Sequence, residues 1–381
     1  MAALPPLGSC EELLAQMVSF ETVNPHFGGP AGGQAALAEH LESLARHWGL
    51  QTRRCPVGDG TFNLLVTAEV SPGAEWLLFE SHLDTVSIDG MTVPPLRMMV
   101  AGDRLHGRGT CDTKGSGAAM LWALRDYARA PGRVRNAGII FALDEEAQMT
   151  GARAFATDEV AKFPRLRGIV VGEPTRLRPV VAHNGALRWR TITRGVAAHS
   201  ADPGQGRSAI SAMLKVITAL ETRFIPLATR EFPLTGRAAA SINVIRGGTA
   251  VNVIPGYCEI ICDRRLVPGE TAAQVIAERD SALAGLAVEH DGQYLAPPLA
   301  PENSAALHAW ASPALTACGL DPTATGAPYA TDASHYAAAG AQVIVLGPGE
   351  MSQAHTKDEW LDRRELARAV AVYEALLRLP A

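Results

Sequence analysis

The stretch GIIFALDEEAQMTGARAF, residues 138–155, changes character near its middle and gives the first indication of the fold. Its first half is a short apolar run, which is typical of a buried strand. Three consecutive acids follow, namely Asp144, Glu145 and Glu146. Because adjacent carboxylates repel one another and resist burial, this turn requires a positively charged partner.

Similar apolar runs alternate with helical patterns along most of the chain. This alternation predicts a largely parallel sheet with helices on both faces, that is, an α/β fold. The segments are AEWLLFESH (74–82), GSGAAMLWALRDYARA (115–130), AGIIFALDEE (137–146), LRGIVVGEPT (166–175), GAQVIVLGPG (340–349) and RRELARAVAVYEALLRL (363–379).

The order of elements changes between residues 181 and 293. Here the patterns run strand, helix, strand, strand, helix, strand, which is the ferredoxin-like motif. We therefore predict an α/β domain formed by residues 1–180 and 294–381, and an inserted ferredoxin-like α+β domain at 181–293. A chain of 381 residues is long enough for two such domains.

Composition excludes several functional classes. A net charge of −5 argues against a binder of nucleic acid or of anionic membranes, and no apolar run is long enough to span a bilayer. The first twenty residues lack a basic start and a long apolar core, so we expect no secretory signal and a cytoplasmic location. The six cysteines form no C-x-x-C motif. Even spacing places Cys258 and Cys262 on one face of a strand, which favours buried apolar side chains over a disulfide or metal ligands.

Acids and histidines cluster where the predicted strands end. Open α/β sheets bind ligands at the carboxyl ends of their strands, so residues distant in sequence can converge there. His82 and Asp84 follow WLLFES, Glu145 and Glu146 end the next run, Glu173 ends IVVGE, His355 follows VIVLGPG, and Asp112 directly precedes a helix.

Each of these residues alone has an ordinary structural explanation. A single His-x-Asp occurs often by chance, Asp112 alone is compatible with a helix N-cap, and three acids alone are typical of a solvated loop. Together, two histidines and three carboxylates suit zinc, or a similar metal such as cobalt or manganese. The set is too large for one tetrahedral ion but suits two ions that share a carboxylate. Only one of Glu145 and Glu146 is needed as a ligand, and its neighbour can act as a general base.

The chain resembles the M20 family of metallopeptidases and amidohydrolases, and within it the acetylornithine deacetylase branch. The resemblance extends from SFETVNP to AHTKDEWLDRREL and so covers nearly the whole chain. It is carried by the motifs SHLDTV, GRGTCDTKGSGAAM, ALDEEAQMTGARAF, VVGEPT, HNG, GVAAHSADPGQGRSAI, DRRLVPG and LGPGEMSQAHTKDEWL.

The resemblance implies a role for each residue of the cluster. His82 and Glu173 are expected to bind one metal ion, Glu146 and His355 the other, and Asp112 both. Glu145 is then the general base. Asp84 is expected to orient the imidazole of His82 through its carboxylate. The resemblance also implies a cis peptide bond between Asp112 and Thr113.

The inserted domain of this family usually forms a dimer and acts as a lid. His199 resembles a histidine that reaches the partner subunit's site and stabilises the oxyanion, although a histidine in a loop near a helix start is also an ordinary surface feature. Asn252 and Arg265 match positions that contact the substrate carboxylate, for which the two-pronged guanidinium is well suited.

These expectations describe an enzyme that uses two divalent metal ions and acts as a homodimer on a small molecule. Zinc is the first candidate metal, and cobalt and manganese are the alternatives. The expected reaction removes the acyl group of an N-acyl amino acid. The first candidate substrate is N-acetylornithine, whose deacetylation is a step of arginine biosynthesis. The alternatives are succinyl-diaminopimelate, a dipeptide, an amino acid joined to a carrier, or the substrate of another aminoacylase or carboxypeptidase with the same metal chemistry. An alternative of another class is a catalytically silent relative that serves as a binding module.

Overall fold

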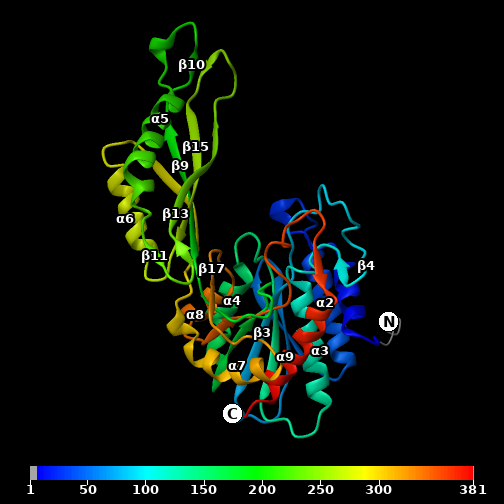
Figure 1. Cartoon of the computed structure of the whole chain (residues 1–381). Coiled ribbons are helices and arrows are strands. Elements are labelled where there is room, and N and C mark those ends of the chain that lie inside the picture. The colour runs from blue at the N-terminus through cyan, green and yellow to red at the C-terminus, as the bar shows by residue number, and fades with distance from the viewer. Residues whose placement is uncertain (1–6, 381) are drawn as a thin grey trace. The chain divides into compact units, whose positions relative to one another are not determined.

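The computed structural model describes residues 7–380, and within these the chain forms two compact units (Figure 1). Unit 1 comprises residues up to Val181 together with Pro301–Thr325 and the segment from Thr331 onward. Unit 2 comprises Ala182–Ala300 and Gly326–Ala330. The assignment of catalysis to the first and of a lid or dimer contact to the second stays a prediction.

Unit 1 is organised around a mixed sheet in which four central strands run parallel, as the alternation of strands and helices predicts. In the order β6, β3, β7, β18, each central strand pairs in parallel with the next, and antiparallel neighbours extend the sheet at both ends. In sheet order the strands are β1 (Gln51–Gly58), β2 (Thr61–Ala68), β6 (Asn136–Ala142), β3 (Trp76–His82), β7 (Leu166–Val171), β18 (Val343–Val345), β8 (Val180–His183) and β17 (Thr325–Ala327).

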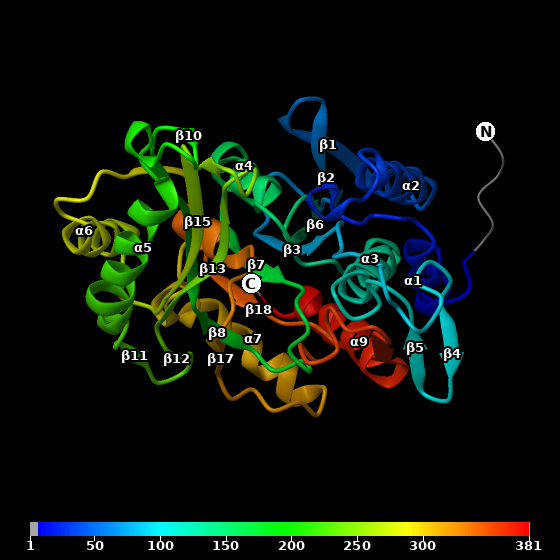
Figure 2. The same ribbon diagram turned by 90° about the horizontal axis from the view of Figure 1, so that it is seen from above.

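Helices cover both faces of this sheet (Figure 2). On one face, Phe79 of β3 is fully buried and packs edge-on against Tyr373 of α9, with ring centroids 5.3 Å apart. On the other face, Phe155 of α4 packs against Tyr336 of α8. The first layer contains α1 (Cys10–Val18), α2 (Gly33–His47), α3 (Lys114–Arg129), α7 (Ala305–Ala317) and α9 (Arg363–Arg378), and the second contains α4 (Thr150–Asp158) and α8 (Ala333–Ala338).

A small three-stranded sheet joins two segments of unit 1 that are far apart in sequence. Strand β5 (Arg104–His106) pairs antiparallel with β4 (Met99–Ala101) and with β19 (Trp360–Asp362). The last of these strands leads into α9, whose N-terminus is capped by the side chain of Asp362. The segment before α3 is thereby tied to the segment before α9.

Unit 2 has the predicted ferredoxin-like topology. Its four antiparallel strands lie in the order β13, β15, β9, β16, and α5 and α6 cover one face. Cys258 and Cys262 are free and buried in this core, as their spacing predicts. The elements are β9 (Gly185–Arg194), α5 (Ala209–Ala219), β13 (Ala239–Gly247), β15 (Tyr257–Leu266), α6 (Ala272–Ala282) and β16 (Glu289–Ala296), with two-residue strands β10 (Ala198–His199), β14 (Val253–Ile254), β11 (Glu231–Phe232) and β12 (Gly236–Arg237).

Among residues 7–380, no helix combines the length and the apolar character needed to cross a lipid bilayer.

A buried histidine at the end of β8 links folding stability to pH. His183 is fully buried, and desolvation lowers the pKa of its imidazole to about 4. Since the unfolded chain binds this proton near pH 6.5, the unfolded state takes up more protons between pH 6.5 and pH 4. We expect the free energy of unfolding to fall by up to about 3 kcal/mol from this residue as the pH falls through that range.

Urea titrations from pH 7 to pH 4 measure this effect. The His183→Gln variant should show a shallower loss of stability with acid than the wild type does. His47→Gln, at the exposed end of α2, is the matched control. Equal slopes for the wild type and His183→Gln would show that the histidine does not cause the acid sensitivity.

Candidate metal centre

The predicted metal ligands lie at one edge of the main sheet because the central strands are parallel. His82 is the last residue of β3 and is aligned with Ala142, the last residue of β6. Glu146 therefore follows the end of a neighbouring strand by one short turn. Glu173 follows the end of β7 in the same way, and His355 lies in the connection after β18.

Asp112 reaches the same place from the loop that precedes α3. Its carboxylate is nearly buried, and the peptide bond between Asp112 and Thr113 is cis, as the resemblance implies. The chain can approach α3 closely here because Gly115 has no side chain. A Cβ atom at that position would lie 2.4 Å from the carbonyl oxygen of Thr110. The loop is thus packed directly onto the first turn of the helix.

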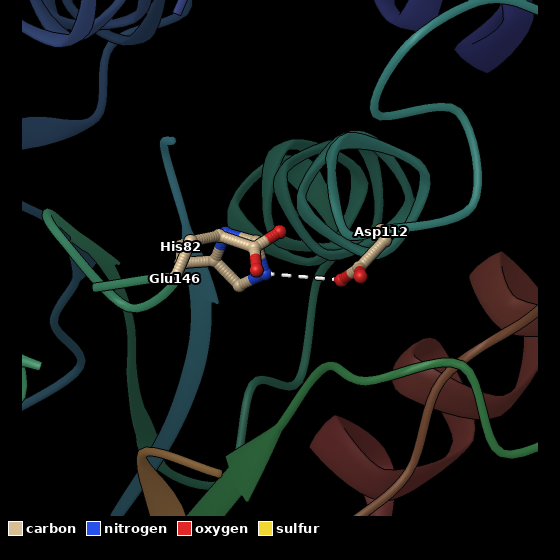
Figure 3. A group of neighbouring side chains, drawn as sticks. All are labelled: His82, Asp112 and Glu146. Carbon is tan, nitrogen blue, oxygen red and sulfur yellow. Dashed lines mark hydrogen bonds and ion pairs between the residues drawn. The ribbon is translucent and has the colours of Figure 1, made fainter. Parts of the chain in front are cut away.

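The carboxylate of Asp112 lies between two imidazoles. Its Oδ1 is 3.1 Å from Nε2 of His82, and its Oδ2 is 3.2 Å from Nε2 of His355. Figure 3 shows the first of these contacts, with Glu146 beside the His82 ring and Asp112 facing it. Each oxygen of one carboxylate therefore faces a different imidazole nitrogen, which is the geometry that a metal-bridging carboxylate would need.

The two glutamates complete the cluster, each near a different imidazole. Glu146 Oε2 is 3.0 Å from Nε2 of His355, and Glu173 Oε1 is 3.9 Å from Nε2 of His82. One ligand atom each from His82, Asp112 and Glu146 lies within 4.8 Å of the others. The structure thus brings all five side chains together within unit 1, in the pairs that the resemblance implies. Their role as ligands stays a prediction.

The donor set fits divalent metal ions. Two imidazole nitrogens and three carboxylates form the mixed nitrogen and oxygen environment that zinc accepts. Hydrogen bonds to Asp112 and then to Glu146 raise the pKa of His355 to about 11. Burial lowers the pKa of His82, but the hydrogen bond to Asp112 and the nearby carboxylates more than compensate, so its pKa rises well above the usual value.

Asp84 organises the cluster differently from our prediction. We expected its carboxylate to orient His82, but Nδ1 of His82 lies 2.9 Å from the main-chain carbonyl oxygen of Asp84 and 3.7 Å from its carboxylate. The carboxylate instead accepts the main-chain N–H groups of Glu145 and Glu146, at 3.0 and 3.1 Å. Because these donors occupy its oxygens, the carboxylate fixes the acidic turn and the carbonyl fixes the ring.

Glu145 has the environment of a group that exchanges protons. Its main-chain N–H donates to the carboxylate of Asp84 at 3.0 Å, which fixes the backbone of the turn. Burial raises the pKa of its carboxyl well above the usual value, and the negative charges of Asp332, Glu146 and Asp112 add to this rise. A carboxyl with a raised pKa holds a proton more readily than an ordinary glutamate does.

Two of the three predicted residues of unit 2, His199 and Arg265, lie on strands, and Asn252 directly precedes β14. His199 on β10 pairs with Val253 on β14, and its Nδ1 accepts the N–H of Ala201 at 3.1 Å. The carbonyl of Asn252 accepts the N–H of Ser200 at 3.0 Å, so His199 and Asn252 are close neighbours. Arg265 lies on β15, where its Nε donates to Asp263 at 2.8 Å. Their functional roles stay predictions.

Several buried polar residues near the cluster were not assigned a role from the sequence. Asn24 donates to both Asp84 and Asp144, at 2.8 Å each, and so connects the N-terminal segment to the acidic turn. Glu80 is buried within β3, and burial raises the pKa of its carboxyl to about 8. Asp332 is fully buried as well. For Glu80, the signal in the sequence is a lone acid inside the apolar run WLLFES.

Comparison with known proteins shows the family to which the sequence is similar. The family model described as Peptidase family M20/M25/M40 matches residues 78–379. The chain is 33% identical over 338 residues to an acetylornithine deacetylase of Edwardsiella ictaluri, with 85% of this chain and 86% of that protein covered. It is also 33% identical over 335 residues to an acetylornithine deacetylase of Proteus mirabilis, covering 86% and 84% of the two chains.

Solved structures share the fold at low sequence identity. An M20 family metallo-carboxypeptidase from Sulfolobus solfataricus matches with a TM-score of 0.79 at 16% identity, covering 98% of this chain and 99% of that one. Human carnosine dipeptidase 1 matches with a TM-score of 0.73 at 15% identity, covering 97% and 96%. A Bacillus subtilis protein described as a dinuclear metal binding peptidase of the M20 family matches with a TM-score of 0.68 at 15% identity, covering 97% and 96%.

Proposed function

The chain belongs to peptidase family M20/M25/M40, and from this membership we propose that it is a dinuclear metal-dependent hydrolase that removes the acyl group of an N-acyl amino acid. The observation that carries the proposal is the position of Asp112, whose two carboxylate oxygens face the imidazoles of His82 and His355 at 3.1 and 3.2 Å. A single carboxylate shared between two nitrogen ligands suits two ions side by side.

The five clustered side chains would hold two divalent ions. Zinc is the leading candidate, and cobalt and manganese are the alternatives. His82 and Glu173 would hold one ion, Glu146 and His355 the other, and Asp112 both. When bound, such ions supply Lewis acidity, which polarises an amide carbonyl and makes water more acidic. The main-chain carbonyl of Asp84 keeps the His82 ring in position by accepting from its second nitrogen at 2.9 Å.

Glu145 would move the proton that amide hydrolysis requires. Its carboxylate takes a proton from the attacking water and returns it to the leaving amine nitrogen, so the group ends the cycle as it began. The hydrogen bond from its main-chain N–H to Asp84 fixes the turn, and its side-chain carboxylate would carry out both transfers. In this proposal the two adjacent acids have different roles: Glu146 would bind a metal ion, and Glu145 would transfer the proton.

Residues of unit 2 would bind and stabilise the substrate. His199 would donate to the oxyanion that forms on the amide carbonyl, and Arg265 with Asn252 would bind the carboxylate of the amino acid. In this proposal the lid histidine acts across a homodimer formed through unit 2. The enzyme is proposed to act in the cytoplasm.

N-acetylornithine is the leading substrate, supported by the names of the relatives at 33% identity. On this basis the reaction would be a step of arginine biosynthesis. The alternatives within the same chemistry are N-succinyl-diaminopimelate, dipeptides and peptides cleaved at their carboxyl end. All of them present an amide next to an amino-acid carboxylate.

A substrate panel tests the specificity. We expect kcat/KM for N-acetylornithine to exceed that for N-succinyl-diaminopimelate and for dipeptides by at least about 10-fold, in protein loaded with zinc, cobalt or manganese. Release of free amine gives the rate. Preference for another member of the panel would change the substrate and leave the metal chemistry in place. Hydrolysis of none of them with any of the three metals would contradict the proposed function.

A further inference from the structure

Glu359 is a fully buried carboxylate beside the loop that carries Asp112. It lies immediately before β19 and is not one of the predicted metal ligands. A buried carboxylate is costly unless donors satisfy its oxygens. The identity of those donors therefore indicates what the residue does.

Four donors converge on the two carboxylate oxygens, and three of them are main-chain groups of one loop. Oε1 accepts the N–H groups of Cys111 and Asp112, at 2.9 and 3.1 Å. Oε2 accepts the N–H of Gly109 at 3.1 Å and Nη1 of Arg108 at 2.7 Å. The carboxylate thus holds the loop at three points, the last of which is the main chain of Asp112 itself.

The main chain of Glu359 fixes the start of the same loop. Its carbonyl oxygen accepts the N–H of Gly107 at 3.1 Å, and the next residue, Trp360, pairs with His106 in the small sheet. Four residues earlier in the chain lies His355, whose imidazole contacts the Asp112 carboxylate. One short segment therefore supplies His355 and also fixes the loop that supplies Asp112.

We propose that Glu359 is a positioning residue of the metal centre, which holds the 108–112 loop so that the Asp112 carboxylate faces His82 and His355 together. This inference rests on the proposed function, because it assigns Glu359 a role toward the metal ions. A purely structural ion pair with Arg108 would need only one of the four contacts. The other three bind the loop main chain up to Asp112, so their loss changes where that carboxylate lies.

Glu359→Gln tests the role by removing one acceptor. Glutamine offers a single carbonyl oxygen, so one pair of donors faces an amide NH₂ group and must move away. We expect zinc affinity, measured by competition with a chromophoric chelator, to fall about 10- to 100-fold. The visible absorption of the cobalt-loaded protein, which reports ligand geometry, should also change. At saturating metal we expect kcat to fall with little change in KM.

Glu75→Gln is the matched control. Glu75 is a largely buried carboxylate just before the opposite end of β3, where it pairs with Arg135 and Arg167 at 2.8 and 2.6 Å. This variant loses the same charge from a buried ion pair, so it is expected to lower thermal stability while leaving zinc affinity and the cobalt spectrum as in the wild type. Glu359→Asp, which keeps the charge but is one methylene shorter, serves if Glu359→Gln does not fold, and its effect should have the same direction.

The outcomes separate this inference from the proposed function. Wild-type protein that binds two ions, together with a folded Glu359 variant that binds them equally well and with the same cobalt spectrum, overturns the positioning role alone. Wild-type protein that binds no divalent ion overturns the metal centre and the positioning role with it. Weaker binding in the Glu359 variant but not in Glu75→Gln supports the role.

Discussion

Replacement of Glu145 by glutamine should lower kcat by about 10³- to 10⁴-fold while the protein stays folded and loaded with metal. Glutamine has nearly the same shape as glutamate, and the hydrogen bond from residue 145 to Asp84 is made by the main chain, so the turn keeps its position. An amide cannot take a proton from water near neutral pH. The loss should therefore fall on kcat, with KM nearly unchanged.

Initial rates and metal content measured on the same preparations provide the test. Glu39→Gln is a suitable control, because Glu39 is an exposed carboxylate on α2 that pairs with Arg54 at 3.3 Å. This variant should keep wild-type kcat. If the Glu145 variant retains more than about a tenth of wild-type kcat with full metal content, proton transfer by Glu145 is wrong.

Asp112→Asn should have the largest effect on metal binding. Asparagine has almost the same size as aspartate but only one oxygen, and its nitrogen has no lone pair for a metal. It also removes one negative charge from between His82 and His355. Loss of an outer partner of a metal ligand typically costs 10- to 100-fold in affinity, so we expect the loss of a shared ligand to cost more than about 100-fold for at least one ion.

Metal content after dialysis against a weak chelator measures this loss. The variant is expected to retain at most one ion per chain and to lose activity by about 10³-fold or more. Asp126→Asn, which removes a carboxylate paired with Arg125 on α3, is the control and should keep the wild-type content. An Asp112 variant that holds two ions as tightly as the wild type would show that Asp112 does not bridge them.

The central part of the fold could be predicted because its signals are local. The apolar runs that become β3, β6 and β7 are short and buried on both faces, and helical patterns separate them, which is sufficient to predict a parallel sheet. The strand order of unit 2 follows in the same way from a sequence of six elements. The strands β1, β2 and β17, towards the two ends of the sheet, were not identified, because their runs are mixed in polarity or very short.

The candidate ligands could be predicted for the same reason, since parallel strands bring their carboxyl ends to one edge. His82, Glu146 and Glu173 need only this rule. The residues that hold the ligands in place could not be found in this way. Asn24 contacts Asp84 across 60 positions of sequence, and Glu359 contacts Asp112 across 247. Nothing in local periodicity indicates a hydrogen bond of that range.

The distinction between the carbonyl and the carboxylate of Asp84 also lay beyond sequence reasoning. A His-x-Asp motif places a carboxylate near an imidazole, but the choice of acceptor depends on what else competes for its oxygens. Here the carboxylate of Asp84 accepts hydrogen bonds from the main-chain N–H groups of Glu145 and Glu146, so the imidazole bonds to the carbonyl instead. The motif therefore predicts that Asp84 supports the site, and only the fold shows which atom contacts which residue.

A crystal grown with excess zinc, with anomalous data collected at the zinc absorption edge, tests the central claim most directly. We predict two peaks per chain about 3.5–4 Å apart. One should lie within about 2.0–2.2 Å of His82 and Glu173, the other within the same distance of Glu146 and His355, and both should contact Asp112. A single peak, or five side chains that bind no zinc between them, would contradict the dinuclear centre.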